Sequence, residues 1–105
     1  MQLFVISWTF TNSEDQIYAS EEFCNFLTQG KLNHNPEGFE LLYAAHMPQD
    51  GTGIVICKAQ SSEILYKIFN MWRDSYGILF EYKPALTNED FLKVFKDEKN
   101  FWDQD

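Results

Sequence analysis

The sequence predicts one α+β domain, in which a four-stranded antiparallel sheet carries two helices on one face and is followed by a short C-terminal helix. The first observation is length, because 105 residues is close to the commonest size of a single domain. The second is the order of the expected elements, strand-helix-strand-strand-helix-strand, which is the split βαβ plan. The third is that apolar residues occupy both faces of the strands, so the second face of the sheet also needs a cover.

The first part of the chain supplies a strand and a helix. Residues 2–10 are rich in β-branched and aromatic types and predict a strand. Ser13 and Gln16 have the spacing of a capping box, which predicts the start of a helix that Gly30 ends. The polar, turn-forming residues 31–38 predict a loop. Apolar residues at helical spacing mark one face of the helix: Ala19, Phe23, Phe26 and Leu27.

A hairpin is expected in the middle of the chain. Strands are predicted over 39–47 and 54–59, with Asp50 and Gly51 at the centre of a two-residue type I′ turn. Counting back from that turn pairs His46 with Val55, on the face that also takes Cys57, while the opposite face takes Tyr43, Met47, Ile56 and Lys58. Strict alternation in the first of these strands places Phe39, Leu41 and Tyr43 on one side and Leu42 and Ala44 on the other.

The last third supplies a second helix and a fourth strand. Ser61 or Ser62 caps the helix, which ends before Gly77. Residues 78–86 predict the strand, with Pro84 at an edge or strand end.

We therefore expect residues 1–87 to form the domain and residues 88–105 to form an acidic C-terminal helix or tail. The large apolar residues Phe101 and Trp102 lie in this tail among charges. They are expected to dock the tail on the same subunit or on a partner subunit, or else the tail frays.

Charge and cysteine content limit the classes of function. A net charge of −8 has the wrong sign for nucleic acid and for anionic membrane surfaces. No apolar run reaches the length of a membrane span, and the N-terminus lacks the pattern of a secretory signal. Cys24 and Cys57 have neither metal-binding nor disulfide spacing, so they are expected to be buried free thiols in a reducing, cytoplasmic compartment.

Five residues are the candidates for binding a ligand. His46, before the hairpin, is a strand-end residue bonded to backbone or water, a polar group of a ligand site, or weakly a catalytic base. Lys58, in an otherwise apolar strand, either reaches solvent or, with Tyr43, holds a carboxylate-bearing ligand. Trp8 and Trp72 belong to the core or form the wall of an apolar chamber.

Metal, cofactor and thiol chemistry are not expected. His34 and Glu37 form an H-x-x-E sequence, but in a loop this spacing has no coordinating geometry, and no metal or cofactor is predicted. Cys57 and Lys58 are adjacent in a strand and point to opposite faces, so Cys57 is predicted to be a packed thiol rather than an activated thiolate.

Two short stretches, LFVISWTF at residues 3–10 and HMPQDGTG at residues 46–53, carry a resemblance to a known group. With the element order, they make residues 1 to 90 similar to the dimeric α+β barrel superfamily of ferredoxin-like domains, and more closely to an uncharacterised bacterial family within it. The resemblance implies a homodimer in which two sheets form a barrel. The superfamily includes cofactor-free monooxygenases, haem-degrading enzymes and lactone isomerases, so the fold does not fix an activity.

The haem-degrading members use an asparagine near the end of the first strand, a tryptophan, and a histidine on a helix. Here the strand has Ser7 and Thr9, Trp72 matches the tryptophan, and the second helix has no histidine. Two of these three parts are missing, so haem degradation is disfavoured. The excess of aromatic and aliphatic side chains on both faces of the strands favours a homodimer that binds a small, largely apolar molecule, with or without a carboxylate group. The alternatives are a cofactor-free monooxygenase or isomerase with His46 as base, and a structural or protein-interaction module.

Overall fold

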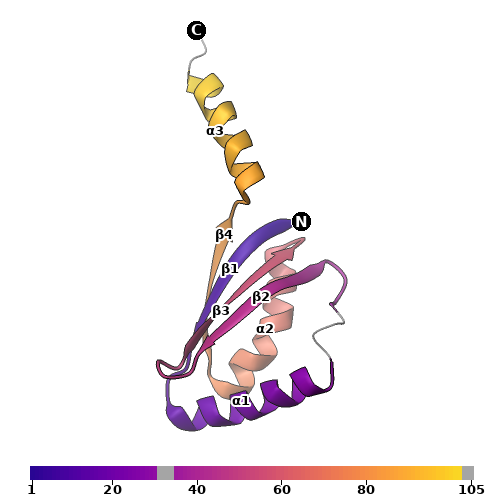
Figure 1. Ribbon diagram of the computed structural model, residues 1–105. Helices are drawn as coiled ribbons and strands as arrows, with labels where there is room; N and C mark the ends of the chain where they lie inside the picture. The colour runs from indigo at the N-terminus through magenta and orange to yellow at the C-terminus, as the bar shows by residue number, and fades with distance from the viewer. Residues whose placement is uncertain (31–34, 103–105) are drawn as a thin grey trace.

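The computed structural model describes residues 1–30 and 35–102 and has the ferredoxin-like α+β fold (Figure 1). The elements are β1 (Gln2–Thr9), α1 (Ser13–Thr28), β2 (Phe39–Met47), β3 (Thr52–Ala59), α2 (Ser62–Tyr76), β4 (Leu79–Ala85) and α3 (Asn88–Trp102). The four strands form one antiparallel sheet in the order β2-β3-β1-β4. The predicted element order and fold class are confirmed. His34, the first residue of the predicted H-x-x-E sequence, lies outside the described residues.

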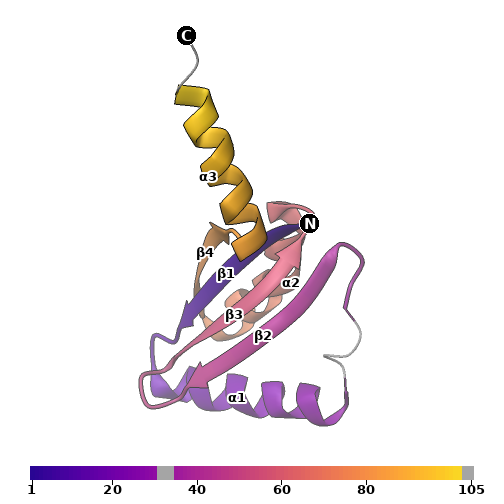
Figure 2. The same ribbon diagram turned by 45° about the horizontal axis from the view of Figure 1, so that its top comes forward.

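Helices α1 and α2 lie on the same face of the sheet (Figures 1 and 2). We call this the inner face, and the opposite side the outer face. Between the inner face and α2 lies the hydrophobic core, whose buried members are Phe4, Ile6, Phe39, Val55, Cys57, Ala59 and Leu65. Burial of one side chain of leucine or isoleucine size stabilises the fold by about 2 kcal/mol. Helix α1 has one buried residue, Ala19, so it contributes little to this core.

Helix α1 begins one residue earlier than the sequence indicated. The side-chain oxygen of Asn12 accepts a hydrogen bond from the Asp15 backbone N–H (2.8 Å), and the Asn12 amide donates to the Asp15 carboxylate (2.7 Å). The predicted capping box of Ser13 and Gln16 is therefore wrong, because Asn12 and Asp15 already form the reciprocal pair. Gln16 instead donates to the Pro48 carbonyl (2.8 Å), which ties α1 to the β2–β3 hairpin.

The other helix boundaries follow the predicted residues. Gly30 follows α1 with φ 68°, and Gly77 caps α2 with φ 63°, a left-handed conformation that favours glycine. Of the two serines considered for the start of α2, Ser61 is the cap, and its hydroxyl accepts a hydrogen bond from the Ile64 N–H (3.4 Å).

The β2–β3 hairpin does not use the predicted two-residue type I′ turn. β2 runs to Met47 and β3 begins at Thr52, so four residues connect the strands. The Asp50 N–H donates to the Met47 carbonyl (3.1 Å) across a turn with Pro48 in its second position, where proline is favoured. Gly51 has a positive φ of 67° and Asp50 does not, whereas a type I′ turn needs both.

The longer loop changes the strand register. His46 pairs with Gly53, so the predicted pairing of His46 with Val55 is wrong. Because the displacement is by two residues, His46 keeps the face that was predicted for it.

A β-bulge at Leu42 interrupts the alternation of β2. Leu41 pairs with Cys57 and Tyr43 pairs with Ile56, so Leu42 is an extra residue between them. The predicted strict alternation is therefore wrong. Leu41 packs against the core on the inner face, whereas Tyr43 lies on the outer face and is 59% exposed.

Helix α3 projects beyond the end of β4, away from the sheet and the other helices (Figures 1 and 2). Its start is capped by Thr87, whose hydroxyl accepts a hydrogen bond from the Asp90 N–H (3.1 Å). No residue of α3 is buried. The radius of gyration is 16.9 Å, whereas a compact domain of this length has about 13 Å. The projecting helix accounts for this elongation.

Candidate functional site

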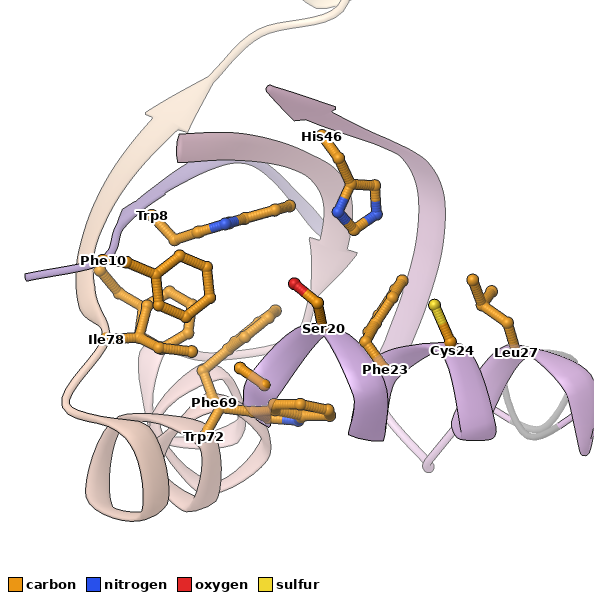
Figure 3. Close-up of a pocket in the computed structure, with 12 residues that line it drawn as sticks. Trp8, Phe10, Ser20, Phe23, Cys24, Leu27, His46, Phe69, Trp72 and Ile78 are labelled. Carbon is orange, nitrogen blue, oxygen red and sulfur yellow. The ribbon is translucent and has the colours of Figure 1, made fainter. Parts of the chain in front are cut away.

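An open cavity of about 250 Å³ lies between the inner face of the sheet and the two helices that cover it (Figure 3). We call it the helix–sheet cleft. It exists because α1 is tied to the hairpin but packs little against the sheet. Its lining residues are Trp8, Phe10, Ala19, Ser20, Phe23, Cys24, Leu27, His46, Phe69, Trp72, Ile78 and Phe80.

The sheet side of the cleft is formed by Trp8 on β1, which lies over a glycine. Gly53 is the cross-strand neighbour of Trp8. A Cβ atom at Gly53 would overlap the Trp8 ring at Cζ2, Cε2 and Cη2. The indole therefore lies flat against the backbone of β3. Any side chain at Gly53 would occupy the same space and displace the ring.

His46 projects from β2 toward α1 at the mouth of the cleft (Figure 3). Its ring centroid is 5.2 Å from that of Trp8, edge-on, and 4.9 Å from that of Phe23. These are ordinary distances for paired aromatic rings. Since His46 also remains exposed, its imidazole can meet solvent or a ligand while the two apolar rings hold it in place.

The helix side of the cleft is an aromatic wall. Phe23 on α1 and Trp72 on α2 stand edge to face with their centroids 6.0 Å apart. Phe69, one turn earlier on α2, lies 5.3 Å from Phe80 of β4 and closes the end of the cleft next to the core. The rings come from both helices and two strands, so the cleft depends on the whole fold rather than on one motif.

Few polar groups reach this cleft. Ser20, Cys24 and His46 are the residues of the lining with polar or titratable side chains. Cys24 is exposed, contrary to the prediction that both cysteines are buried, because α1 stands off the sheet. Among the described residues, no carboxylate lines the cleft, and no group of three or more His, Cys, Asp or Glu is suited to a metal ion.

Cys57 is buried in the core beneath the cleft and contributes no nucleophile to it. Burial raises the pKa of its thiol from the ordinary value of 9.0 to about 11. The neutral thiol is therefore favoured, and Cys57 behaves as a small apolar core residue, as the sequence predicted.

The structure brings together three of the five candidate ligand residues. Trp8, His46 and Trp72 all line the helix–sheet cleft. Tyr43 and Lys58 lie on the outer face of the sheet, in register with Ile56 and Leu3 respectively. One small ligand cannot touch both groups, because the sheet separates them.

Several lining residues were not singled out from the sequence as site residues. Phe23 and Leu27 were visible as the apolar stripe of α1, a pattern that equally describes a packed core. Gly53 does not line the cleft but lies beneath Trp8, and its sequence signal is weaker, since an isolated glycine in a strand often marks a close approach. No sequence signal shows how far α1 stands from the sheet.

The fold and the cleft define a small ferredoxin-like α+β domain with an aromatic cavity between its sheet and its helices. A family model with the description "domain of unknown function (DUF3303)" matches residues 2–99, and the chain belongs to this family. Comparisons with curated proteins and with solved structures gave no match. In the described part of the chain, every helix is too short or too polar to cross a membrane.

Proposed function

We propose that the protein binds a small, largely apolar aromatic molecule in the helix–sheet cleft, and that it does so as a cytoplasmic homodimer. The observation that carries the proposal is an open cavity lined by six Trp and Phe side chains with a single histidine at its mouth. Binding pockets are typically apolar with a few placed polar groups. The free thiols of Cys24 and Cys57 fit a reducing compartment.

The size of the cleft limits the ligand to one or two rings. Its volume of about 250 Å³ is below the roughly 300–1,000 Å³ of pockets for drug-sized molecules. It exceeds the roughly 150 Å³ of a cavity that admits benzene.

The chemistry of the cleft favours a neutral ligand with one hydrogen-bonding group. His46 offers a ring nitrogen to a hydroxyl or carbonyl at the mouth, and apart from Ser20 and Cys24 on α1 the remaining contacts are aromatic or aliphatic. A carboxylate is not required, since Lys58 lies across the sheet and the net charge of −8 repels anions.

The outer face supports the homodimer. Val5, Ile54 and Ile56 lie side by side there, and the isolated chain leaves them partly exposed. An antiparallel sheet with an apolar second face needs a cover, which a second copy related by a twofold axis supplies. This is the assembly implied by the resemblance to dimeric α+β barrels.

The binding proposal can be tested with 2-naphthol, a two-ring compound with one hydroxyl group. In ¹⁵N-labelled protein, the indole N–H resonances of Trp8 and Trp72 should shift on titration. Trp102, on the projecting helix and outside the cleft, should not shift and serves as an internal control. Equal shifts of all three resonances, or none at millimolar 2-naphthol, would contradict the proposal.

A filled-cleft variant provides a second test. Ser20 points into the cleft from α1 (Figure 3), so Ser20→Phe should weaken 2-naphthol binding at least about tenfold by occupying the space. Glu21→Phe, at the next residue of the same helix and outside the cleft lining, is the matched control and should change the affinity less than about threefold. Equal affinity of the two variants would contradict binding in the cleft.

The second candidate function is a cofactor-free monooxygenase or isomerase. The specific observation in its favour is the placement of the His46 imidazole on the cleft wall, between Trp8 and Phe23, where a base would face a bound ligand. Mass spectrometry and chromatography of 2-naphthol after incubation in air separate the two functions. A product formed by the native protein and not by His46→Ala would favour the enzyme, whereas unchanged 2-naphthol that still binds would favour a binding protein.

A further inference from the structure

Helix α3 carries a wide apolar face that nothing in the described part of its own chain covers. Six large side chains form this face, each between 47% and 74% exposed: Phe91, Leu92, Val94, Phe95, Phe101 and Trp102. Phe91, Phe95 and Trp102 form the centre of this face, because Phe95 and Trp102 follow Phe91 by about one and three turns, and the other three residues flank them. The opposite side carries charged and amide residues, including Lys93, Lys96 and Asn100.

The outer face of the sheet is the second uncovered surface. Over β2 and β3 it consists mainly of Tyr43, Met47, Ile54 and Ile56, with Lys58 and its cross-strand neighbour Glu40 at one end. The outer side of β4 is different, because Lys83 and Glu81 form an ion pair there (3.4 Å). The apolar part of the outer face therefore lies toward β2 and β3.

We propose that α3 is an exchanged arm: in the homodimer, the apolar face of each α3 packs on the outer face of β2 and β3 of the second copy. This inference rests on the proposed homodimer and adds what holds it together. Each chain carries both the apolar face of α3 and the outer face of β2 and β3. In a dimer with a twofold axis, each α3 therefore covers the sheet of the other copy, and the assembly is closed.

The dimensions of the two surfaces match. A helix of 15 residues is about 22 Å long, and a strand of 8 residues is about 26 Å long. A helix is roughly 10 Å wide and strands are spaced about 4.8 Å apart, so one helix covers two strands. The outer side of β1, which carries Leu3 and Val5, remains free for direct contact between the two copies.

The area is sufficient for a stable dimer. Six side chains of this size and exposure leave roughly 600 Å² per arm to be buried. Two arms and the two sheet surfaces beneath them would bury roughly 2,400 Å², more than the roughly 1,200–2,000 Å² of a typical stable interface.

One ion pair can form between the two surfaces, from Glu98 of the helix to Lys58 of the sheet. Glu98 follows Phe91 by seven residues, so it lies within the apolar face of α3 rather than on the charged side. Lys58, at the edge of the apolar sheet surface, lies opposite Glu40 in the register but forms no ion pair with it. Within the described residues, neither Glu98 nor Lys58 has an ion-pair partner. Packing α3 on β2 and β3 lets each carboxylate meet a lysine of the second copy.

The test measures dimer dissociation by sedimentation, first for the native protein and then for two matched variants. Phe95→Asp places one negative charge on the apolar face of α3, and Asn100→Asp places one on the opposite side. We expect a native dimer, a dissociation constant raised at least about 30-fold by Phe95→Asp, and a change under about threefold for Asn100→Asp. Both side chains are exposed, so neither substitution should unfold the domain, which circular dichroism checks.

A charge exchange tests where the arm lies. Lys58→Glu and Glu98→Lys should each weaken the dimer, and the double variant should recover affinity to within about threefold of the native protein. A native dimer unaffected by Phe95→Asp would overturn the exchanged arm and leave the homodimer standing, whereas a native monomer would overturn both. A dimer weakened by Phe95→Asp but not restored by the charge exchange would overturn the placement on the sheet, as when two α3 helices pair with each other.

Discussion

Gly53 shows how one absent side chain shapes the helix–sheet cleft. The Trp8 ring occupies the volume that a Cβ atom at this position would take. The glycine has no positive φ, so its role comes from this close approach rather than from backbone conformation. Trp8 in turn meets His46, so the position of the histidine depends indirectly on the glycine.

Gly53→Ala should destabilise the protein by about 1–3 kcal/mol, because the added methyl group forces the indole off the strand. Denaturant unfolding measures this cost. In a Trp8→Leu background the same substitution should cost less, since the ring atoms that the methyl group meets are gone. An equal loss of unfolding free energy in both backgrounds would show that the methyl group clashes with atoms other than those of Trp8.

Cys57 gives the fold a dependence on alkaline pH. The folded thiol has a pKa of about 11, above that of an unfolded chain, so between pH 9 and 11 the unfolded chain releases its proton first. The stability contributed by Cys57 is therefore complete below about pH 8.5 and falls by on the order of 2 kcal/mol as the pH approaches 11.

The measurement is the difference in unfolding free energy between the native protein and Cys57→Ala at pH 8 and at pH 10.5. This difference should shrink as the pH rises, because the variant lacks the titrating group. Val55→Ala, at a buried core position without a titratable group, is the control and should show a constant difference. The same constancy for Cys57→Ala would mean that burial does not raise the pKa of the thiol.

At the scale of elements, competing local signals decide the boundaries. Asn12 and Ser13 are both good caps, and Asn12 prevails because Asp15 lies three residues after it and returns a hydrogen bond. In the hairpin, the chain forms a turn with Pro48 in its second position instead of the predicted type I′ turn centred on Asp50 and Gly51. Proline favours this position because its φ is already fixed near the value that the turn needs. In both places sequence reasoning found the element and chose the wrong residue within it.

Asn12→Ala should therefore destabilise the protein by about 1 kcal/mol through loss of the α1 cap. Asn12→Ser should recover most of this stability, because a serine hydroxyl also accepts from the Asp15 N–H. Asn25→Ala, at an exposed position within α1, is the matched control and should be neutral or slightly stabilising. Thermal unfolding of the three variants measures these changes in stability. Equal losses of stability for Asn12→Ala and Asn25→Ala would exclude a capping role for Asn12.

At the scale of the whole molecule, the predictable features are those that local patterns determine. The seven elements, the sheet and the helices on one face follow from periodicity, turn residues and element order. The cleft does not, because it depends on the distance between α1 and the sheet, which no pattern within α1 specifies. Trp8, His46 and Trp72 were identified by residue type, but that they surround one cavity is a result of tertiary packing.

The projecting α3 belongs to the same scale. The sequence predicts an acidic helix or tail here, and the segment forms a helix capped by Thr87. Which surface the apolar face of α3 packs on depends on the assembly. The sequence of one chain therefore does not decide between the same subunit and a partner subunit. The isolated chain buries none of this face, and we have proposed the partner accordingly.

The bulge at Leu42 has a consequence for how this strand tolerates changes of length. Deletion of one residue within a strand normally moves every following side chain to the opposite face of the sheet. Here Leu42 is the supernumerary residue, so its removal would restore regular pairing and leave Leu41 inside, Tyr43 outside and His46 at the cleft. Relatives one residue shorter at this point would keep the same two surfaces, and an alignment gap there would not signal a change of function.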